Sequence, residues 1–222
     1  MNALDSAVNS IREYINRYND EGKKMFASSS FQTHSIPMLH IISSIDNAIP
    51  VYFINTGFHF PETIAFRDKV AQDFGLNLVD LESLVPKNQQ RDEDGNLYFA
   101  SDPDYCCFLN KTQPMAPVLQ QMDVWINGVR GDQNANRKAM QVEAKTPQGA
   151  LRYHPMLHWT SKMIFDYAKQ HNLPKHPLET QGYLSIGCEP CTRKFSFDND
   201  RGGRWYGMKK TECGLHTDLI KK

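Results

Sequence analysis

The chain has 222 residues, 40% of them hydrophobic, and its 25 Lys and Arg balance 25 Asp and Glu to a formal charge of zero. A chain of this length fits one domain with a short tail, and it can bury roughly 70% of its unfolded surface without disulfides. The neutral charge and ordinary composition argue against a disordered chain or a nucleic-acid-binding protein, and no apolar run is long enough to cross a membrane.

The first twenty residues predict an amphipathic helix. Apolar side chains recur at every third or fourth position, at Leu4, Val8, Ile11, Ile15 and Tyr18. This spacing lays one apolar stripe on a helix, which suits packing against a core. Acidic charge comes early in the segment, which is unlike a signal peptide, so we expect a cytoplasmic protein.

Strand and helix patterns alternate along the following part of the chain. Four short apolar runs predict strands at residues 25–27, 51–54, 76–81 and 124–126. The first two runs lead through polar loops into helical patterns, and Pro61 suits the first turn of the second helix. The alternation predicts an α/β fold with a central, mostly parallel sheet and helices on both faces. Its ligand site is expected at the carboxyl edge of the sheet, where the loops meet.

The second half of the chain is less regular. Residues 86–104 are charged and rich in turn formers, which predicts an insertion leading to a pair of cysteines. Thr160 and Ser161 can cap a helix that ends before Pro174. Apolar periodicity fades from residue 195 onward, so we predict a nucleotide-binding domain over residues 1–194 and a tail over residues 195–222.

A serine-rich loop follows the first predicted strand. Ser28, Ser29 and Ser30 offer hydroxyl and backbone N–H groups just before a helix, where the helix dipole favours an anion. Such loops are also common as plain helix caps, so this signal is weak by itself. The chain lacks the GxxxxGK[ST] pattern, which disfavours a Walker-type nucleotidase.

Four of the five cysteines form two tight groups, Cys106 with Cys107 and Cys188 with Cys191. The second pair is a CxxC, a spacing that supplies two thiolates to one metal centre. Adjacent cysteine side chains diverge, which hinders joint binding of one zinc ion but suits the separate iron atoms of a cluster. The pattern therefore favours an iron-sulfur cluster over zinc, and buried inert cysteines are the plain alternative.

The fifth cysteine, Cys213, lies near Lys209, Lys210 and His216. Nearby positive charge is expected to lower the pKa of its thiol and favour a nucleophilic thiolate. An accidental surface cysteine is the alternative. Together with the serine loop and the clustered cysteines, this pattern predicts attack on a polyanionic sulfur or phosphorus centre.

Several motifs in this order resemble a known family. They are residues 28–30, Asn55-Thr56-Gly57 with residues 61–63, Cys106-Cys107 with Lys111 and Pro114, residues 125–137 and 155–160, SIGCEPCT at 185–192, Gly203-Arg204-Trp205, and ECGLH at 212–216. Over about residues 24–217 the chain resembles assimilatory adenylyl-sulfate reductases, including members that also accept the 3′-phosphorylated nucleotide. SIGCxPCT and ECGLH together are highly specific.

The resemblance implies a fold of the adenine nucleotide alpha-hydrolase (PP-loop) type with a mobile C-terminal tail. It implies a 4Fe-4S cluster on Cys106, Cys107, Cys188 and Cys191. Cys213 would attack the sulfur of adenosine 5′-phosphosulfate, expel AMP and become S-sulfonated. Thioredoxin or a glutaredoxin-like dithiol would then release sulfite, as in assimilatory sulfate reduction. His216, three residues after the nucleophile, would orient the tail or assist protonation.

The resemblance also implies a set of substrate-binding residues. Lys111 would bridge cluster and substrate, and the backbone of Gly128 would lie by the adenine. Three arginines would hold phosphate or sulfate oxygens. The full set is Ser28, Ser29, Ser30, Thr56, Gly57, Lys111, Gly128, Arg137, Arg201 and Arg204.

The sequence departs from the family's pattern at Asn110 and Gly131, among other places. It also leaves alternative substrates and functions open. Asn110 and Gly131 stand where many members have arginine, so the anion site is less cationic than usual. The same chemistry on 3′-phosphoadenosine 5′-phosphosulfate, or on both nucleotides, is the main alternative. A PP-loop enzyme that adenylates its substrate with ATP and a cluster-based redox sensor are further alternatives, and a homo-oligomer is left open.

Overall fold

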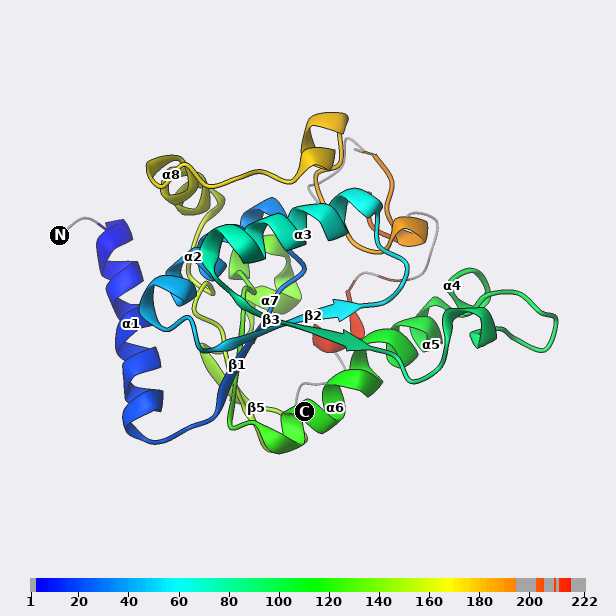
Figure 1. Ribbon diagram of the computed structural model, residues 1–222, viewed down its shortest axis with the longest axis horizontal. Helices are drawn as coiled ribbons and strands as arrows, with labels where there is room; N and C mark the ends of the chain where they lie inside the picture. Colours follow the sequence, from blue (N-terminus) through cyan, green and yellow to red (C-terminus); the bar gives the residue numbers. More distant parts are fainter. Residues whose placement is uncertain (1–2, 195–202, 206–209, 211, 217–222) are drawn as a thin grey trace.

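The computed structural model describes residues 3–194, 203–205, 210 and 212–216. Six strands form its central sheet (Figure 1). The strands are β1 (Met25–Ser28), β2 (Pro50–Asn55), β3 (Asn77–Glu82), β4 (Val124–Asn127), β5 (Glu143–Lys145) and β6 (Leu151–Tyr153).

The strand order is β3-β2-β1-β4-β6-β5, and every pair is parallel except β5 with β6. The prediction of a mostly parallel sheet, with strands at the four predicted places, is therefore confirmed. The sequence analysis missed β5 and β6. Each has only three residues, and Glu143–Lys145 carries no apolar run that could signal a strand.

Helices cover both faces of the sheet, as predicted (Figure 1). The longer helices are α1 (Ala3–Asp20), α2 (Ile36–Ile45), α3 (Pro61–Phe74), α6 (Gln113–Gln121) and α8 (Ser161–Gln170). On one face Ala27, Val51 and Ile126 pack with buried side chains of α1, α2, α3 and α8. On the other face Phe26 and Trp125 pack with α6. Neighbouring strand residues face opposite sides of the sheet. Because helices cover both sides, the strand residues on each side are apolar.

Local sequence signals set the ends of two helices. Pro61 occupies the first turn of α3, and Gly75 ends that helix with a left-handed φ of 61°. The side chain of Thr160 accepts a hydrogen bond from the N–H of Met163 and so caps α8. Both predicted helix starts are confirmed.

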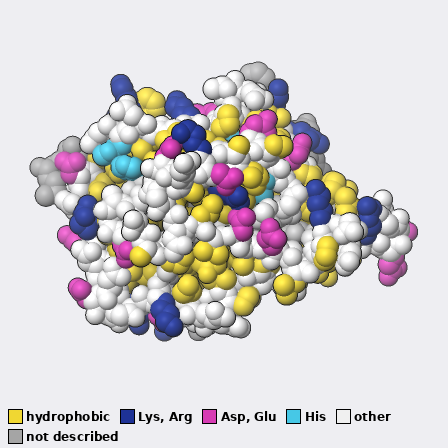
Figure 2. All heavy atoms as spheres, viewed as in Figure 1, with side chains coloured by type: hydrophobic (Ala, Val, Ile, Leu, Met, Phe, Trp, Pro, Cys, Tyr) yellow, Lys and Arg dark blue, Asp and Glu magenta, His cyan; other side chains and the backbone are white. Residues whose placement is uncertain are grey.

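Residues 86–104 form an excursion that projects from the body toward the right of Figure 1. It contains a 3₁₀ turn (Lys87–Gln89) and α4 (Tyr98–Ser101), then leads into α5 (Pro103–Cys107). Figure 2 shows basic and acidic side chains together on this part of the surface. A π-turn (Phe108–Thr112) follows α5 directly and joins it to α6, a local distortion that often occurs at functional sites.

Within the described residues, no helix is both long and apolar enough to span a bilayer. The predicted division into a domain and a tail falls at residues 195–202, which lie outside the described residues, and it stays a prediction.

Candidate functional site

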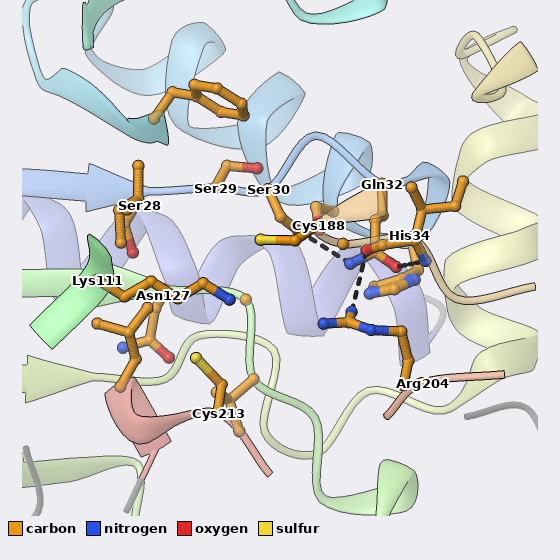
Figure 3. A pocket seen from close by; sticks show the side chains of 18 of the residues that line it. Ser28, Ser29, Ser30, Gln32, His34, Lys111, Asn127, Cys188, Arg204 and Cys213 are labelled. Atoms are coloured by element: carbon orange, nitrogen blue, oxygen red, sulfur yellow. Dashed lines mark hydrogen bonds between the residues drawn. The ribbon is translucent and has the colours of Figure 1, made fainter. Parts of the chain in front are cut away.

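A pocket opens at the carboxyl edge of the sheet, where the loops after β1 and β4 meet (Figure 3). Residues from the SIGCEPCT and ECGLH motifs complete its wall. The motif residues in this lining include Ser28, Ser29, Ser30, Lys111, Asn127, Gly128, Arg137, Gly187, Cys188, Arg204, Glu212 and Cys213. The topology thus brings together most of the side chains expected to bind substrate, at the predicted edge of the sheet.

The serine loop is held in place by its own hydrogen bonds. Ser28 Oγ accepts from Trp125 Nε1 at 2.7 Å, and Ser29 Oγ accepts from the N–H of Phe31 at 3.0 Å. Phe31 is fully buried with a φ of 52°, a left-handed conformation that few bulky residues adopt. The packing of Phe31 therefore stabilises a strained turn that aims residues 28–30 at the pocket.

The four clustered cysteines line a second, smaller pocket next to the first. Cys106 and Cys107 come from α5, whereas Cys188 precedes and Cys191 ends a 3₁₀ turn (Glu189–Cys191). The N–H of Glu189 donates to the carbonyl of Phe58 at 2.7 Å, which pins this turn to the loop after β2. All four cysteines are free thiols. Among the described residues, however, no three Cys, His, Asp or Glu side chains form a group that could hold a metal ion.

Polar side chains contact two of these sulfurs. Thr56 Oγ1 lies 3.3 Å from Cys188 Sγ, and Asn110 Nδ2 lies 3.6 Å from Cys106 Sγ. Gln90 and Asn110 exchange two buried hydrogen bonds of 2.9 and 2.6 Å. Thr56, expected at the nucleotide, thus lines the cysteine pocket, and exposed Gly57 lines neither pocket.

Lys111 lines both pockets, and its charge interacts with cysteine sulfurs in each of them. Burial raises the pKa of Cys106 to about 12, and the neighbouring sulfurs of Cys107 and Cys188 add to this. Burial lowers the pKa of Lys111, but attraction to Cys188, Cys213 and Cys107 outweighs it, so the pKa lies above its ordinary value. The Lys111 ammonium group therefore stays charged, between the clustered cysteines on one side and Cys213 on the other.

Cys213 lies half-buried in the wall of the pocket that the serine loop lines (Figure 3). Lys111, Lys210 and Arg152 all lie within electrostatic reach of its thiol. Lys210 also contacts the carboxylate of Asp104. Lys209 lies outside the described residues, and of His216 only the backbone, in the turn Gly214–His216, is described. Of the predicted cations, Lys210 is described beside Cys213, and Lys111 and Arg152 are cations that the sequence did not predict there; for Lys209 and the His216 side chain the prediction stays a prediction.

Arg137 contacts the tail as well as lining the pocket. Its Nε and Nη2 donate to the two carboxylate oxygens of Glu212 at 2.8 and 3.0 Å. Glu212 also accepts from Asn134 Nδ2 at 2.9 Å and from the N–H of Cys213 at 3.0 Å. Arg137 is 6% exposed and Glu212 5%, so the pair is buried beside the nucleophile candidate. The sequence analysis expected Arg137 to bind substrate and did not foresee this partner.

Two other predicted residues line this pocket, and a third is not described. Arg204 donates from Nη1 to the carbonyl of Ile186 at 3.1 Å and stacks 4.5 Å from the ring of Trp205. A side chain at Gly187 would meet this guanidinium, so Arg204 would have to move to accept one. Gly128 packs against Met38 in the pocket wall. Arg201 lies outside the described residues.

Comparison with known proteins identifies the family. Residues 24–194 match the phosphoadenosine phosphosulfate reductase domain. A protein named adenosine 5′-phosphosulfate reductase from Chelativorans sp. (strain BNC1) is 41% identical over 205 residues, covering 91% of this chain and 82% of that protein. The chain belongs to the adenosine 5′-phosphosulfate and phosphoadenosine phosphosulfate reductase family.

Solved structures show that the fold is that of this family and of some nucleotide-binding enzymes. A phosphoadenylyl-sulfate (PAPS) reductase from Candida auris, in a phosphate complex, matches with a TM-score of 0.69 at 20% identity, over 84% of this chain and 94% of that one. An FMN adenylyltransferase from Candida glabrata matches with a TM-score of 0.61 at 14% identity, over 99% and 74% of the two chains. The predicted PP-loop type of α/β fold is confirmed.

Two buried polar residues of this reductase-family chain escaped the sequence analysis. Arg152 on β6 donates to the carbonyl of Leu215 at 3.0 Å, beside Cys213, and lies 4.4 Å from the Trp125 ring. Burial, and then Arg137, lower the pKa of Arg152 to about 9. Asn127 ends β4 in the pocket wall. Arg152 belongs to none of the matched motifs. Asn127 lies within one of them, residues 125–137, but the sequence does not show that its amide is buried in the pocket wall.

Proposed function

We propose that this chain reduces adenosine 5′-phosphosulfate to sulfite and AMP, with Cys213 as the nucleophile. Its family membership makes it an oxidoreductase that acts on a sulfur group. The observation that carries the proposal is the position of the Cys213 thiol, which lines the same pocket as Lys111 and the serine loop at the carboxyl edge of the sheet. A thiol, a fixed cation and an anion-binding loop are the groups that this reaction needs.

The first step transfers the sulfonyl group to Cys213. The Cys213 thiolate attacks the substrate sulfur, an S–S bond forms, and the S–O bond to AMP breaks with its electron pair going to the phosphate oxygen. Negative charge grows on that oxygen, and Lys111, at the same end of the pocket as Cys213, would stabilise it. The serine loop and the first turn of α2 would hold the α-phosphate.

The second step regenerates the thiol with an external dithiol. One thiolate of a thioredoxin-like or glutaredoxin-like protein attacks Cys213 Sγ, and sulfite leaves with the electron pair of the S–S bond. The second thiol of the partner then attacks the mixed disulfide and frees Cys213. The two electrons that reduce the sulfur therefore come from the dithiol, which becomes a disulfide.

Adenosine 5′-phosphosulfate is the substrate we favour over its 3′-phosphorylated form. Asn110 is neutral and buried, and Gly131 packs tightly against the Leu157 carbonyl, so neither supplies positive charge. The guanidinium of Arg130 is engaged by Asp132 and Ser161, and that of Arg137 by Glu212. An additional phosphate would therefore meet fewer available cations, and the 3′-phosphorylated nucleotide remains the alternative substrate.

Mass spectrometry of the peptide that carries Cys213 tests the proposed function. After mixing with adenosine 5′-phosphosulfate without reductant, we expect a sulfonate mass on this peptide and one AMP released per chain. Side-by-side assays should give a kcat/KM about 10- to 1000-fold higher than with the 3′-phosphorylated nucleotide. A sulfonate elsewhere in the chain would refute the proposal, and pyrophosphate release from ATP would favour an adenylating enzyme.

We also propose that Cys106, Cys107, Cys188 and Cys191 hold a 4Fe-4S cluster. The donor chemistry fits the group, because four free thiols line one pocket and polar side chains contact two of the sulfurs, while among the described residues no three of the thiols are grouped around a single metal position. When bound, the cluster would supply a compact charged centre that joins α5 to the SIGCEPCT turn. Lys111 would stand between it and the substrate.

Chemical analysis of protein purified without oxygen tests the cluster. We expect about four iron atoms and four sulfide ions per chain, since that is the composition of the cluster. Cys188→Ser should lose most of this iron, because one of four ligands is removed. Cys213→Ser is the matched control and should keep it. Stoichiometric zinc in place of iron, or iron loss in the control, would contradict the assignment.

A further inference from the structure

Asn127 is a buried polar side chain for which the mechanism above has no use. It is the last residue of β4, lies in register with Ser28 of β1 and is 3% exposed. Among the described residues, neither Nδ2 nor Oδ1 has a hydrogen-bond partner. Burying an unpaired amide costs free energy, so such a position needs a physical reason.

The amide lies in the wall of the pocket that Cys213 also lines. In Figure 3 Asn127, Lys111 and Cys213 gather at one end of the pocket, whereas His34 and Arg204 lie at the other. Electrostatic coupling between Lys111 and Cys213 agrees with this grouping. A ligand whose reacting atom is in reach of Cys213 therefore comes close to Asn127.

Other orphaned polar atoms in the described lining of this pocket belong to side chains that are otherwise engaged. His59 lacks a partner at Nδ1 but bonds the carbonyl of Ile54 through Nε2. Arg204 lacks one at Nε but donates to Ile186 through Nη1. Asn127 is the side chain in this lining whose polar atoms are all buried and all unpaired, which is the state expected of a group that a ligand completes.

We infer that Asn127 binds the sulfonyl group that Cys213 attacks, with Nδ2 donating to a sulfonyl oxygen. The inference rests on the proposed function, since it names a contact of the same substrate. Lys111 supplies positive charge at this end of the pocket, and the neutral Asn127 amide adds a hydrogen-bond donor with a fixed direction. A directed donor fixes the sulfonyl group so that the bond to AMP points away from the attacking sulfur. Binding of substrate thus satisfies the buried amide as it orients the reacting bond.

The experiment compares turnover of adenosine 5′-phosphosulfate with competitive inhibition by AMP, which lacks the sulfonyl group. Asn127→Ala should lower kcat/KM by roughly 10- to 100-fold, the loss expected for one hydrogen bond to a charged group, and leave the AMP inhibition constant nearly unchanged. Asn127→Asp should lose more, because a carboxylate replaces the donor and repels the sulfonate. The matched control is Asn77→Ala, an exposed position at the opposite end of a strand, where neither value should change.

The outcomes separate this contact from its competitors. A ribose hydroxyl both donates and accepts, so if Asn127 bound the ribose, both constants would worsen together and the inference would be overturned. Unchanged turnover in a folded Asn127→Ala protein would also overturn the inference. If Asn127→Ala and Asn127→Asp unfold, Asn127→Ser is measured in their place. Wild-type protein that forms no Cys213 sulfonate would instead mean that the proposed function itself is wrong.

Discussion

Replacing Cys213 by serine is expected to abolish sulfite formation while AMP still binds. Two thiols line the described pocket, and Cys188 belongs to the proposed cluster site, which leaves Cys213 to attack sulfur; Lys111, Lys210 and Arg152 lie within electrostatic reach of it. A serine hydroxyl is not ionised at neutral pH and is a far weaker nucleophile. We expect kcat to fall by roughly 10⁴-fold or more, because no other residue takes over covalent catalysis.

Sulfite and AMP release measure this loss, and equilibrium binding of AMP is the internal control. The serine variant should bind AMP as the parent does, because the substitution changes one atom of the pocket wall. Residual sulfite formation within about tenfold of the parent would mean that another group receives the sulfonate. Loss of AMP binding would point to a collapsed pocket instead of a missing nucleophile.

Glu212→Gln is expected to weaken both the fold and catalysis. Glu212 accepts hydrogen bonds from Arg137, Asn134 and the N–H of Cys213, and its side chain is 2% exposed. A neutral glutamine leaves the buried Arg137 charge uncompensated, which typically costs about 3–5 kcal/mol of unfolding free energy. Glu212 precedes Cys213 in the chain and accepts its N–H, so a displacement of Glu212 is expected to move Cys213 as well. A nucleophile misplaced by about 1 Å loses roughly 100-fold in kcat.

Denaturant unfolding and steady-state kinetics measure the two effects of Glu212→Gln. The matched control is Asp166→Asn, which breaks an exposed pair with Lys162 on α8 and should cost less than about 1 kcal/mol. Equal losses of stability in the two variants would show that the Arg137–Glu212 pair is not a buried anchor. A folded Glu212→Gln protein with unchanged kcat would show that this pair does not position Cys213.

The sequence by itself predicted the elements that have strong local signals. The buried strands at residues 25–27 and 51–54 are apolar runs followed by polar loops, and Pro61 and Thr160 mark helix starts by local chemistry. The spacing of the cysteines and the ECGLH motif are likewise properties of the linear chain. A parallel sheet with its ligand site at one edge follows from these patterns, and the family comparison agrees with them.

Only the tertiary structure decided which side chains pair with one another. Arg137 and Glu212 are 75 residues apart, and nothing in either segment indicates that one holds the other. The same is true of Arg152 beneath Leu215 and of the unpaired amide of Asn127. The physical reason is that burial and hydrogen-bond partners depend on the packing of distant segments, whereas helix caps and strand patterns depend on neighbouring residues.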